Sequence, residues 1–270
     1  MWHNIDWRWR DGAAELTSSP LNSQLSAGAR IVAISDGDVS LALEQVDFTE
    51  EPDGNLPSYT AYRSFTQRQS QLATLLQSPQ LKLIDDAGLA HPIGYQNQRP
   101  LSDLPAAFWV QIFVGLAAWL ICSAVGAYKT QDASARYLVI SGGSTLLFAS
   151  LAAIYSTREL AIDGQLFRLL SDLNFLGGMM FAATLVCVLW HYPKQLGSSW
   201  VPPTIILVAI AWFALQQLGA FESMIVGRRL PVLLALLAQF HLKFYAMAQH
   251  PRRSNSSRGA AMVFAFVAAD

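Results

Sequence analysis

The chain changes character at residues 100–105. Residues 1–99 mix polar and apolar side chains at short spacing, whereas the sequence after residue 105 consists of long apolar stretches joined by short polar loops. As an α-helix, about 20 apolar residues cross the roughly 30 Å hydrocarbon core of a bilayer. The sequence therefore predicts a small water-exposed domain at residues 1–99, a linker at 100–105 and a polytopic transmembrane domain at 106–270.

Five apolar stretches have the length of membrane spans, and a sixth is cut short by the end of the chain. They lie at about residues 106–128, 137–155, 175–190, 201–218 and 230–248, with the partial stretch at 260–270. Charged residues make up only 14% of the chain, against about a quarter in soluble domains. We expect an α-helical membrane bundle of five spans plus a truncated sixth, with the lipid bilayer as its surroundings.

The basic residues of the short loops predict the orientation of these spans. The first, third and fifth loops are richer in Lys and Arg than the second and fourth. Cytoplasmic loops carry an excess of these residues in multi-pass proteins. The N-terminal domain is therefore expected on the extracytoplasmic side of the membrane.

The N-terminal domain has the pattern of a compact α+β unit. The apolar spacing from Phe65 to Leu76 predicts a helix over residues 64–76, with Ser64 as its N-cap. β-Branched or alternating runs, two of them followed by turns rich in Asp and Gly, predict strands at residues 31–34, 39–46, 80–84 and 91–94. The first eleven residues, rich in Trp and Arg, are interpreted either as a segment at the membrane–water interface or as an exposed loop.

The chemistry of this domain points to binding rather than catalysis. The sequence has no nucleophile–base pair, no metal-ligand spacing and no phosphate-binding glycine loop, so no catalytic residue, metal or cofactor is expected. A net charge of −1 without a basic patch argues against nucleic acid. A strand edge beside a helix accepts an extended peptide. The candidate peptide groove consists of Ile31, Val32, Ala33, Ile34, Phe65 and Leu72.

A second candidate site lies between the second and third spans. Its polar residues are Arg158, Glu159, Asp163 and Asp172. They are interpreted either as a charged sensor surface at the outer membrane face or as a solvated loop stabilised by i,i+4 pairs. The solvated loop is the favoured interpretation.

Two stretches resemble known families. Ser19-Pro20 followed by GARIVAISDG at residues 28–37 resembles the bacterial PDZ signature, in which Gly-Asp-x-Ile-x-x-Ile-x-Gly follows a Ser-Pro; Ala29 takes the place of the Asp. A PDZ-like region before several spans, with YSTREL at 155–160 and DGQLFR at 163–168, is similar to the sensor half of bacterial membrane histidine kinases that work with LuxR/NarL-type regulators.

This resemblance implies a location in the bacterial inner (plasma) membrane, a peptide or protein ligand, a homodimer and a signal relayed to a cytoplasmic kinase domain that the chain lacks. As it stands, the chain has no phosphoacceptor box and no ATP lid, so no enzyme activity is expected. The leading interpretation is a membrane signal-sensing module. The alternatives are a non-enzymatic scaffold whose PDZ-like domain recruits a partner, and a transporter or membrane-enzyme subunit. The third is disfavoured because no span carries a central carboxylate.

Overall fold

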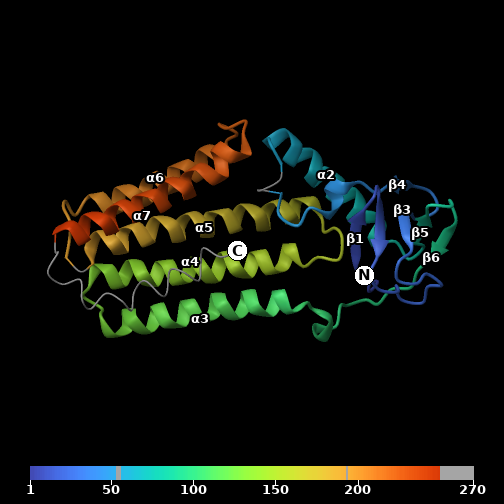
Figure 1. The fold of residues 1–270 in the computed structure, drawn as a ribbon, viewed down its shortest axis with the longest axis horizontal. Coiled ribbons are helices and arrows are strands. Elements are labelled where there is room, and N and C mark those ends of the chain that lie inside the picture. Colours follow the sequence, from blue (N-terminus) through green and yellow to red (C-terminus); the bar gives the residue numbers. More distant parts are fainter. Residues whose placement is uncertain (53–55, 193, 250–270) are drawn as a thin grey trace.

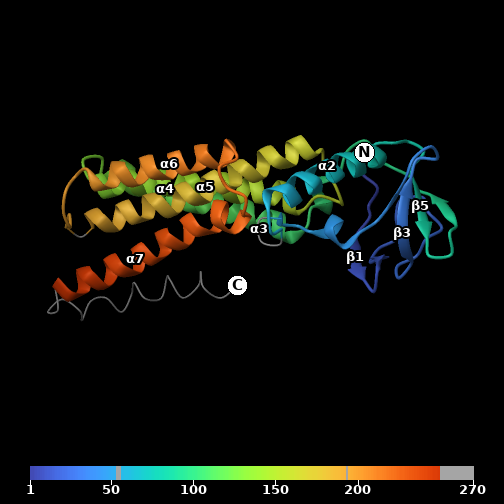
Figure 2. The ribbon, with the colours of Figure 1, turned by 90° about the horizontal axis from the view of Figure 1, so that it is seen from above.

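The structure is a small β-sheet domain attached to one end of a long helical bundle (Figure 1). It is a computed structural model that describes residues 1–52, 56–192 and 194–249. The partial span predicted at residues 260–270 therefore lies outside the described residues. Both views place the helix of the sheet domain beside the end of the bundle that faces the sheet (Figures 1 and 2).

The sheet is antiparallel and six-stranded, with β3 at its centre. The order is β1-β2-β3-β5-β6, and β4 also pairs with β3. The strands are β1 (Trp7–Arg10), β2 (Ala13–Leu16), β3 (Arg30–Ser35), β4 (Ser40–Ala42), β5 (Lys82–Asp85) and β6 (Ala90–Pro92). Strand β3 is buried along most of its length, with Ile31 and Ile34 fully buried, and its register with β5 shifts between Ile31 and Ala33.

The first hairpin was not expected from the sequence. Trp7 and Trp9 alternate with Arg8 and Arg10 along β1, as in a strand with one covered face. Asp11 and Gly12 then form a two-residue turn with φ of 49° and 81°, a conformation that Asp-Gly readily adopts. The first eleven residues are thus part of the folded domain rather than an exposed loop. Trp2 and Ile5 are buried parts of the domain.

The later strands lie where they were expected, with one difference. The predicted strand at residues 39–46 is only the short β4, because residues Gln45–Phe48 form a 3₁₀ helix, η1. Inside η1 the buried Asp47 carboxylate accepts the backbone N–H of Glu44 at 2.8 Å. It also pairs with Arg68 of the neighbouring helix. This local bonding competes with further strand pairing.

Helix α2 (Tyr59–Leu76) is longer than the helix predicted at 64–76. Ser58 is its N-cap, and the Ser58 hydroxyl accepts the backbone N–H of Ala61 at 3.2 Å. Ser64 lies inside the helix. The C-terminal half of α2 covers the sheet with Leu72, Leu75 and Leu76 and so completes the core of the domain.

The bundle consists of α3 (Ala106–Tyr128), α4 (Ala133–Ser156), α5 (Gly164–His191), α6 (Val201–Gln217), the π-helical turn η3 (Ile225–Arg229) and α7 (Leu230–Gln249). Four helical segments of the described chain are long and apolar enough to cross a membrane: α3, α4, α5 and Ile225–Phe244. They indicate a multi-pass membrane protein. Helix α6, the span predicted at residues 201–218, is apolar but has only 17 residues.

The outward surface of the bundle is apolar, which fits a lipid environment. Apart from Gly115, every residue of α3 is at least partly exposed, and Phe113 and Ile121 are 70% and 65% exposed. Such a surface is unfavourable in water. Helix α5 starts eleven residues before the predicted third span, because the charged residues Arg168 and Asp172 are part of the helix rather than of a loop.

Candidate functional site

The loop between α4 and α5 joins the sheet domain to the bundle. This junction loop, residues 157–163, leaves the membrane helix α4 and returns to α5. Between the two, Leu160 is 4% exposed and packs in the hydrophobic core of the sheet domain, with Ala161 against the same core. A connection between two spans is therefore also a structural part of the sheet domain.

Arg158 forms the densest set of contacts in the junction loop. Its guanidinium donates to the carbonyl oxygens of Thr49 at 2.6 Å and Glu50 at 3.3 Å, and to Gln69 of α2 at 3.2 Å. It also lies 4.9 Å from the ring centroid of Phe167 in α5. Burial lowers the pKa of Arg158 to about 10, so the group is still charged at neutral pH. One side chain thus connects the segment after η1 with α2 and α5.

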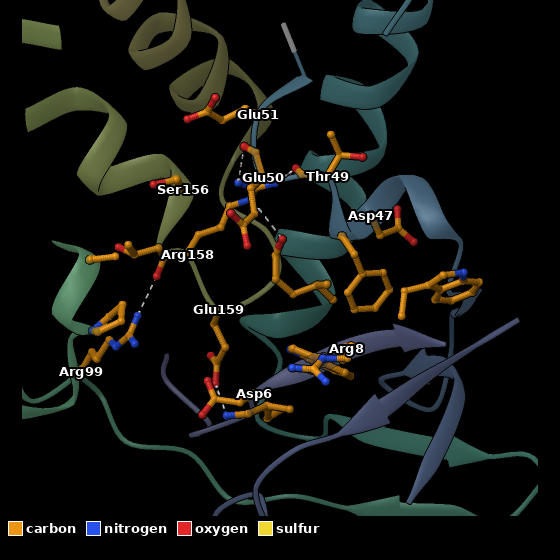
Figure 3. A pocket seen from close by; sticks show the side chains of 18 of the residues that line it. Asp6, Arg8, Asp47, Thr49, Glu50, Glu51, Arg99, Ser156, Arg158 and Glu159 are labelled. Carbon is orange, nitrogen blue, oxygen red and sulfur yellow. Dashed lines mark hydrogen bonds between the residues drawn. The ribbon is translucent and has the colours of Figure 1, made fainter. Parts of the chain in front are cut away.

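Glu159 holds the N-terminal segment against the bundle. Its carboxylate accepts the backbone N–H groups of His3 at 3.1 Å and Ile5 at 2.7 Å. The Nδ1 atom of the fully buried His3 lies 3.6 Å from the same carboxylate. Figure 3 shows Arg158 and Glu159 reaching in opposite directions, the first toward Thr49 and Glu50 and the second toward the segment that carries Asp6.

Asp163 fixes the start of α5 beside α2. It is the N-cap of α5 and accepts the backbone N–H groups of Gln165 and Leu166 at 3.0 and 3.1 Å. These bonds, the one from Leu166 foremost, lower the pKa of Asp163. The Ser70 hydroxyl of α2 contacts Asp163 at 3.3 Å and accepts the N–H of Gly164 at 2.9 Å.

Asp172 belongs to a separate cluster, one that the sequence did not reveal. It pairs with Arg228 of η3, a guanidinium that also donates to the Ser171 hydroxyl at 2.6 Å. Arg228 is 3% exposed and lies 5.0 Å from the ring centroid of Tyr62 in α2. The structure brings Arg158, Glu159 and Asp163 together on one loop and places Asp172 with η3. All four hold elements together. One predicted i,i+4 pair is present, between Arg168 and Asp172 at 3.7 Å, and Asp163 is exposed, as the solvated-loop interpretation expects.

Apolar side chains complete this interface. A junction core combines residues of α2, α4, α5 and the segment before η3: Tyr62, Phe65, Tyr155, Phe167, Leu170 and Met224. The rings of Phe65 and Phe167 meet edge to face with centroids 5.3 Å apart. Helix α2 therefore has two roles, since its first half packs on the bundle and its second half packs on the sheet.

The peptide groove predicted on residues 31–34 is not formed. Ile31, Ile34 and Leu72 have no exposed surface, and Phe65 lies in the junction core. Ala33 is also buried, and Val32 is half-buried. Strand β3 pairs with β2 and β4 along one edge and with β5 along the other. A strand with both edges paired has no backbone groups left to bind a peptide.

A large cleft opens instead where the domain meets the bundle (Figure 3). This junction cleft has a volume of about 1460 Å³. Its walls are residues 4–9, the segment 45–51, the start of α3 and the end of α4 with the junction loop. Six carboxylates line it, Asp6, Asp47, Glu50, Glu51, Asp103 and Glu159, together with the three guanidinium groups of Arg8, Arg99 and Arg158.

The cleft has no metal-binding character in the described part of the chain, where no group of three His, Cys, Asp or Glu residues is placed to hold an ion. The two cysteines, Cys122 and Cys187, lie in the bundle as free thiols. The junction cleft thus offers charge and hydrogen-bonding groups on a wide, open surface.

Comparison with family models, with curated proteins and with solved structures finds no match to this chain. The resemblance to PDZ domains and to the sensor halves of histidine kinases rests on the quoted residues alone. What the junction cleft can do follows from its own geometry.

Proposed function

We propose that this protein is a membrane signal-sensing module. A ligand binds in the junction cleft of an extracytoplasmic N-terminal domain, and the bundle responds by a shift of its helices. As in the kinases that the sequence resembles, a cytoplasmic output region reads that shift. The observation that carries the proposal is the position of the junction loop, which packs Leu160 in the domain core while linking two spans.

The geometry supports a relay because the junction loop lines the cleft, contacts the sheet domain and connects two helices of the bundle. Arg158, Glu159 and the end of α4 line the cleft, so a ligand there contacts the bundle directly. The same Arg158 donates to carbonyls of the domain, and Glu159 accepts from the N-terminal segment. A ligand that favours one arrangement of these contacts shifts the population of helix packings by its difference in affinity. The scaffold alternative needs the cleft but no such response.

Hydrogen exchange on the full chain in lipid nanodiscs tests the relay. We expect Leu160→Ala to accelerate amide exchange at the domain-facing ends of α4 and α5, because the loop loses its anchor in the domain core. Leu25→Ala is the matched control, since Leu25 is 8% exposed, lies in the same core and is not part of the junction loop.

The control separates a relay from general loss of stability. Both variants remove a similar apolar side chain from one core, so both accelerate exchange in the sheet. The proposal requires that only the Leu160 variant affects α4 and α5. Equal responses of the bundle in the two variants, or none in either, would contradict it and favour the scaffold.

A further inference from the structure

One wall of the junction cleft is the free edge of a β-strand. Four consecutive residues, Asp6, Trp7, Arg8 and Trp9, line the cleft. Successive side chains of a strand point to opposite faces of the sheet. A wall that includes all four positions therefore presents the edge of the strand and not one of its faces. In the described part of the chain, β1 pairs with β2 alone.

The register of the hairpin shows which backbone groups this edge presents. Trp7 lies opposite Leu16, whose N–H and C=O bond to Ala29 and Gly28, on the side away from β1. In an antiparallel strand pair, opposite residues that hydrogen-bond to each other alternate with opposite residues whose N–H and C=O groups point away from the partner strand. The N–H and C=O groups of Trp7, and by the same alternation those of Trp9, therefore point outward from the sheet.

The exposed side chains of the cleft favour a basic partner. Asp6, Glu50 and Asp103 are exposed carboxylates on the cleft wall, while Arg8 is the exposed cation there. The other two arginines of the cleft are engaged, because Arg158 and Arg99 donate to backbone carbonyls. Opposite charges across an interface select the partner and speed its association.

The two tryptophans add a further binding feature. Trp7 and Trp9 pack around Phe48, with ring centroids 6.2 and 5.4 Å from it. The Trp7 indole N–H is buried and has no hydrogen-bond acceptor among the described residues. Indole rings attract the cationic heads and apolar stems of Lys and Arg. The strand edge thus offers backbone pairing next to aromatic and acidic side chains.

We infer that the junction cleft binds a basic peptide in extended form, added as a new strand to the edge of β1. The cleft exceeds the 300–1,000 Å³ typical of small-molecule pockets, which fits a chain segment better than a single small cation. The four residues of β1 span about 13 Å, so the contact covers a peptide of about four to six residues. This inference names the ligand class of the proposed sensor and depends on that proposal only for the response of the bundle.

Fluorescence anisotropy of a labelled peptide measures this binding directly. The full chain is placed in phosphatidylcholine nanodiscs, so that the lipid carries no net charge, and the probe is Lys-Thr-Lys-Thr-Lys-Thr. We expect saturable binding that weakens as salt is raised. The acidic analogue Glu-Thr-Glu-Thr-Glu-Thr and empty nanodiscs with the basic probe should give no signal.

Two comparisons separate strand addition from simple charge attraction. The same basic peptide with N-methyl groups on alternate amides keeps its charge but loses pairing along one edge, and we expect about tenfold weaker binding. The combined variant D6N/E50Q/D103N should also bind about tenfold more weakly. The variant D38N, which neutralises an exposed carboxylate outside the cleft, should bind like the wild type.

Several outcomes would overturn the inference. Equal affinity of the N-methylated peptide, or full displacement of the probe by spermine, would make the cleft a site for organic cations. Binding unaffected by D6N/E50Q/D103N would place the peptide elsewhere, and failure of the basic peptide to bind at all would reject the ligand class. If the peptide binds but leaves exchange in α4 and α5 unchanged, the ligand class stands and the relay fails. If Leu160→Ala affects the bundle but no peptide binds, the relay stands and the ligand class fails.

Discussion

The core of the sheet domain and the junction with the bundle are held together by different means. The main core of the sheet domain is a cluster of apolar side chains, with Ile31, Leu72 and Leu83 fully buried, and the ion pair of the buried Asp47 with Arg68 links η1 to α2. The junction combines an apolar core with buried guanidinium groups and with close approaches of helix backbones. Arg228 is buried against Tyr62, and Gly164 lies against the carbonyl of Thr66 in α2.

This difference has a consequence for how each region responds to change. Apolar packing loses stability in proportion to the area removed and tolerates substitutions of similar volume. Removing a partner of a buried charge costs about 3–5 kcal/mol, and adding a side chain where two backbones approach closely costs about 1–3 kcal/mol, so single changes there have large effects. The junction is therefore the region where a small perturbation redirects the packing of helices, as a relay requires.

The largest effect is expected at the buried ion pair. Asp172→Ala removes a carboxylate that pairs with Arg228, a guanidinium that is 3% exposed, which should cost about 3–5 kcal/mol of unfolding free energy. Thermal unfolding of the full chain in detergent measures the loss.

A second substitution at the same pair tests the cause. The double variant Asp172→Leu/Arg228→Met replaces the pair by apolar side chains and should recover much of the lost stability. A double variant as unstable as Asp172→Ala would show that packing, and not the lost ion pair, accounts for the loss. In that case the junction would resemble the sheet core after all.

The same difference explains what could be predicted from the sequence. β3, β5 and the start of α3 follow from local patterns, because alternation, turn residues and apolar length are read over a few neighbours. The hairpin β1–β2 also carried its signal in Trp7, Trp9 and the Asp11-Gly12 turn. It was missed because Trp and Arg side by side are equally typical of a membrane interface.

The contacts of the candidate site could not be predicted from the sequence, and the reason is physical. The partners of Arg158 and Glu159 lie 109 and 154 residues away along the chain, at Thr49 and Ile5. The pair of Asp172 and Arg228 is separated by 56 residues. No local pattern encodes such contacts. The charge cluster of the second loop was recognised, but its role as a set of connections depends on the folded arrangement.

A smaller effect is expected where α5 approaches α2. A methyl group at Gly164 would lie 1.9 Å from the Thr66 carbonyl oxygen, so Gly164→Ala must push the two helices apart. Overpacking of this kind costs about 1–3 kcal/mol. Gly178→Ala in the same helix is the control, because nothing lies within 4 Å of the added methyl group.

The control should move in the opposite direction. Alanine is the better helix former by about 1 kcal/mol, so Gly178→Ala should raise the unfolding temperature while Gly164→Ala lowers it. Unfolding curves of the two variants under one condition decide the matter. If Gly164→Ala is also stabilising, the two helices have room to separate without cost, and the close approach does not hold the junction.

The smallest effect on stability is expected when the pH is lowered. Hydrogen bonds lower the pKa of Asp85 in the sheet, chiefly the one with His91 at 2.8 Å, as they lower that of Asp163 at the junction. A carboxyl group with a lower pKa in the folded state stabilises the fold above its unfolded pKa, near 4. That stabilisation disappears as the pH falls through the folded value. The wild type should therefore lose more stability between pH 5 and pH 2 than either Asp85→Asn or Asp163→Asn.

Protonation of Asp85 and protonation of Asp163 should weaken different contacts, one in the sheet and one at the junction. Asp85 connects β5 with His91 of β6 at the edge of the sheet, so its protonation should loosen that edge alone. Asp163 caps α5 and contacts Ser70 of α2, so its protonation should weaken the contact between domain and bundle. Hydrogen exchange of the wild type at pH 5 and pH 3, corrected for the intrinsic rate, should show the second change at the start of α5. Acid-induced exchange confined to β5 and β6 would mean that the N-cap of α5 does not connect the two regions.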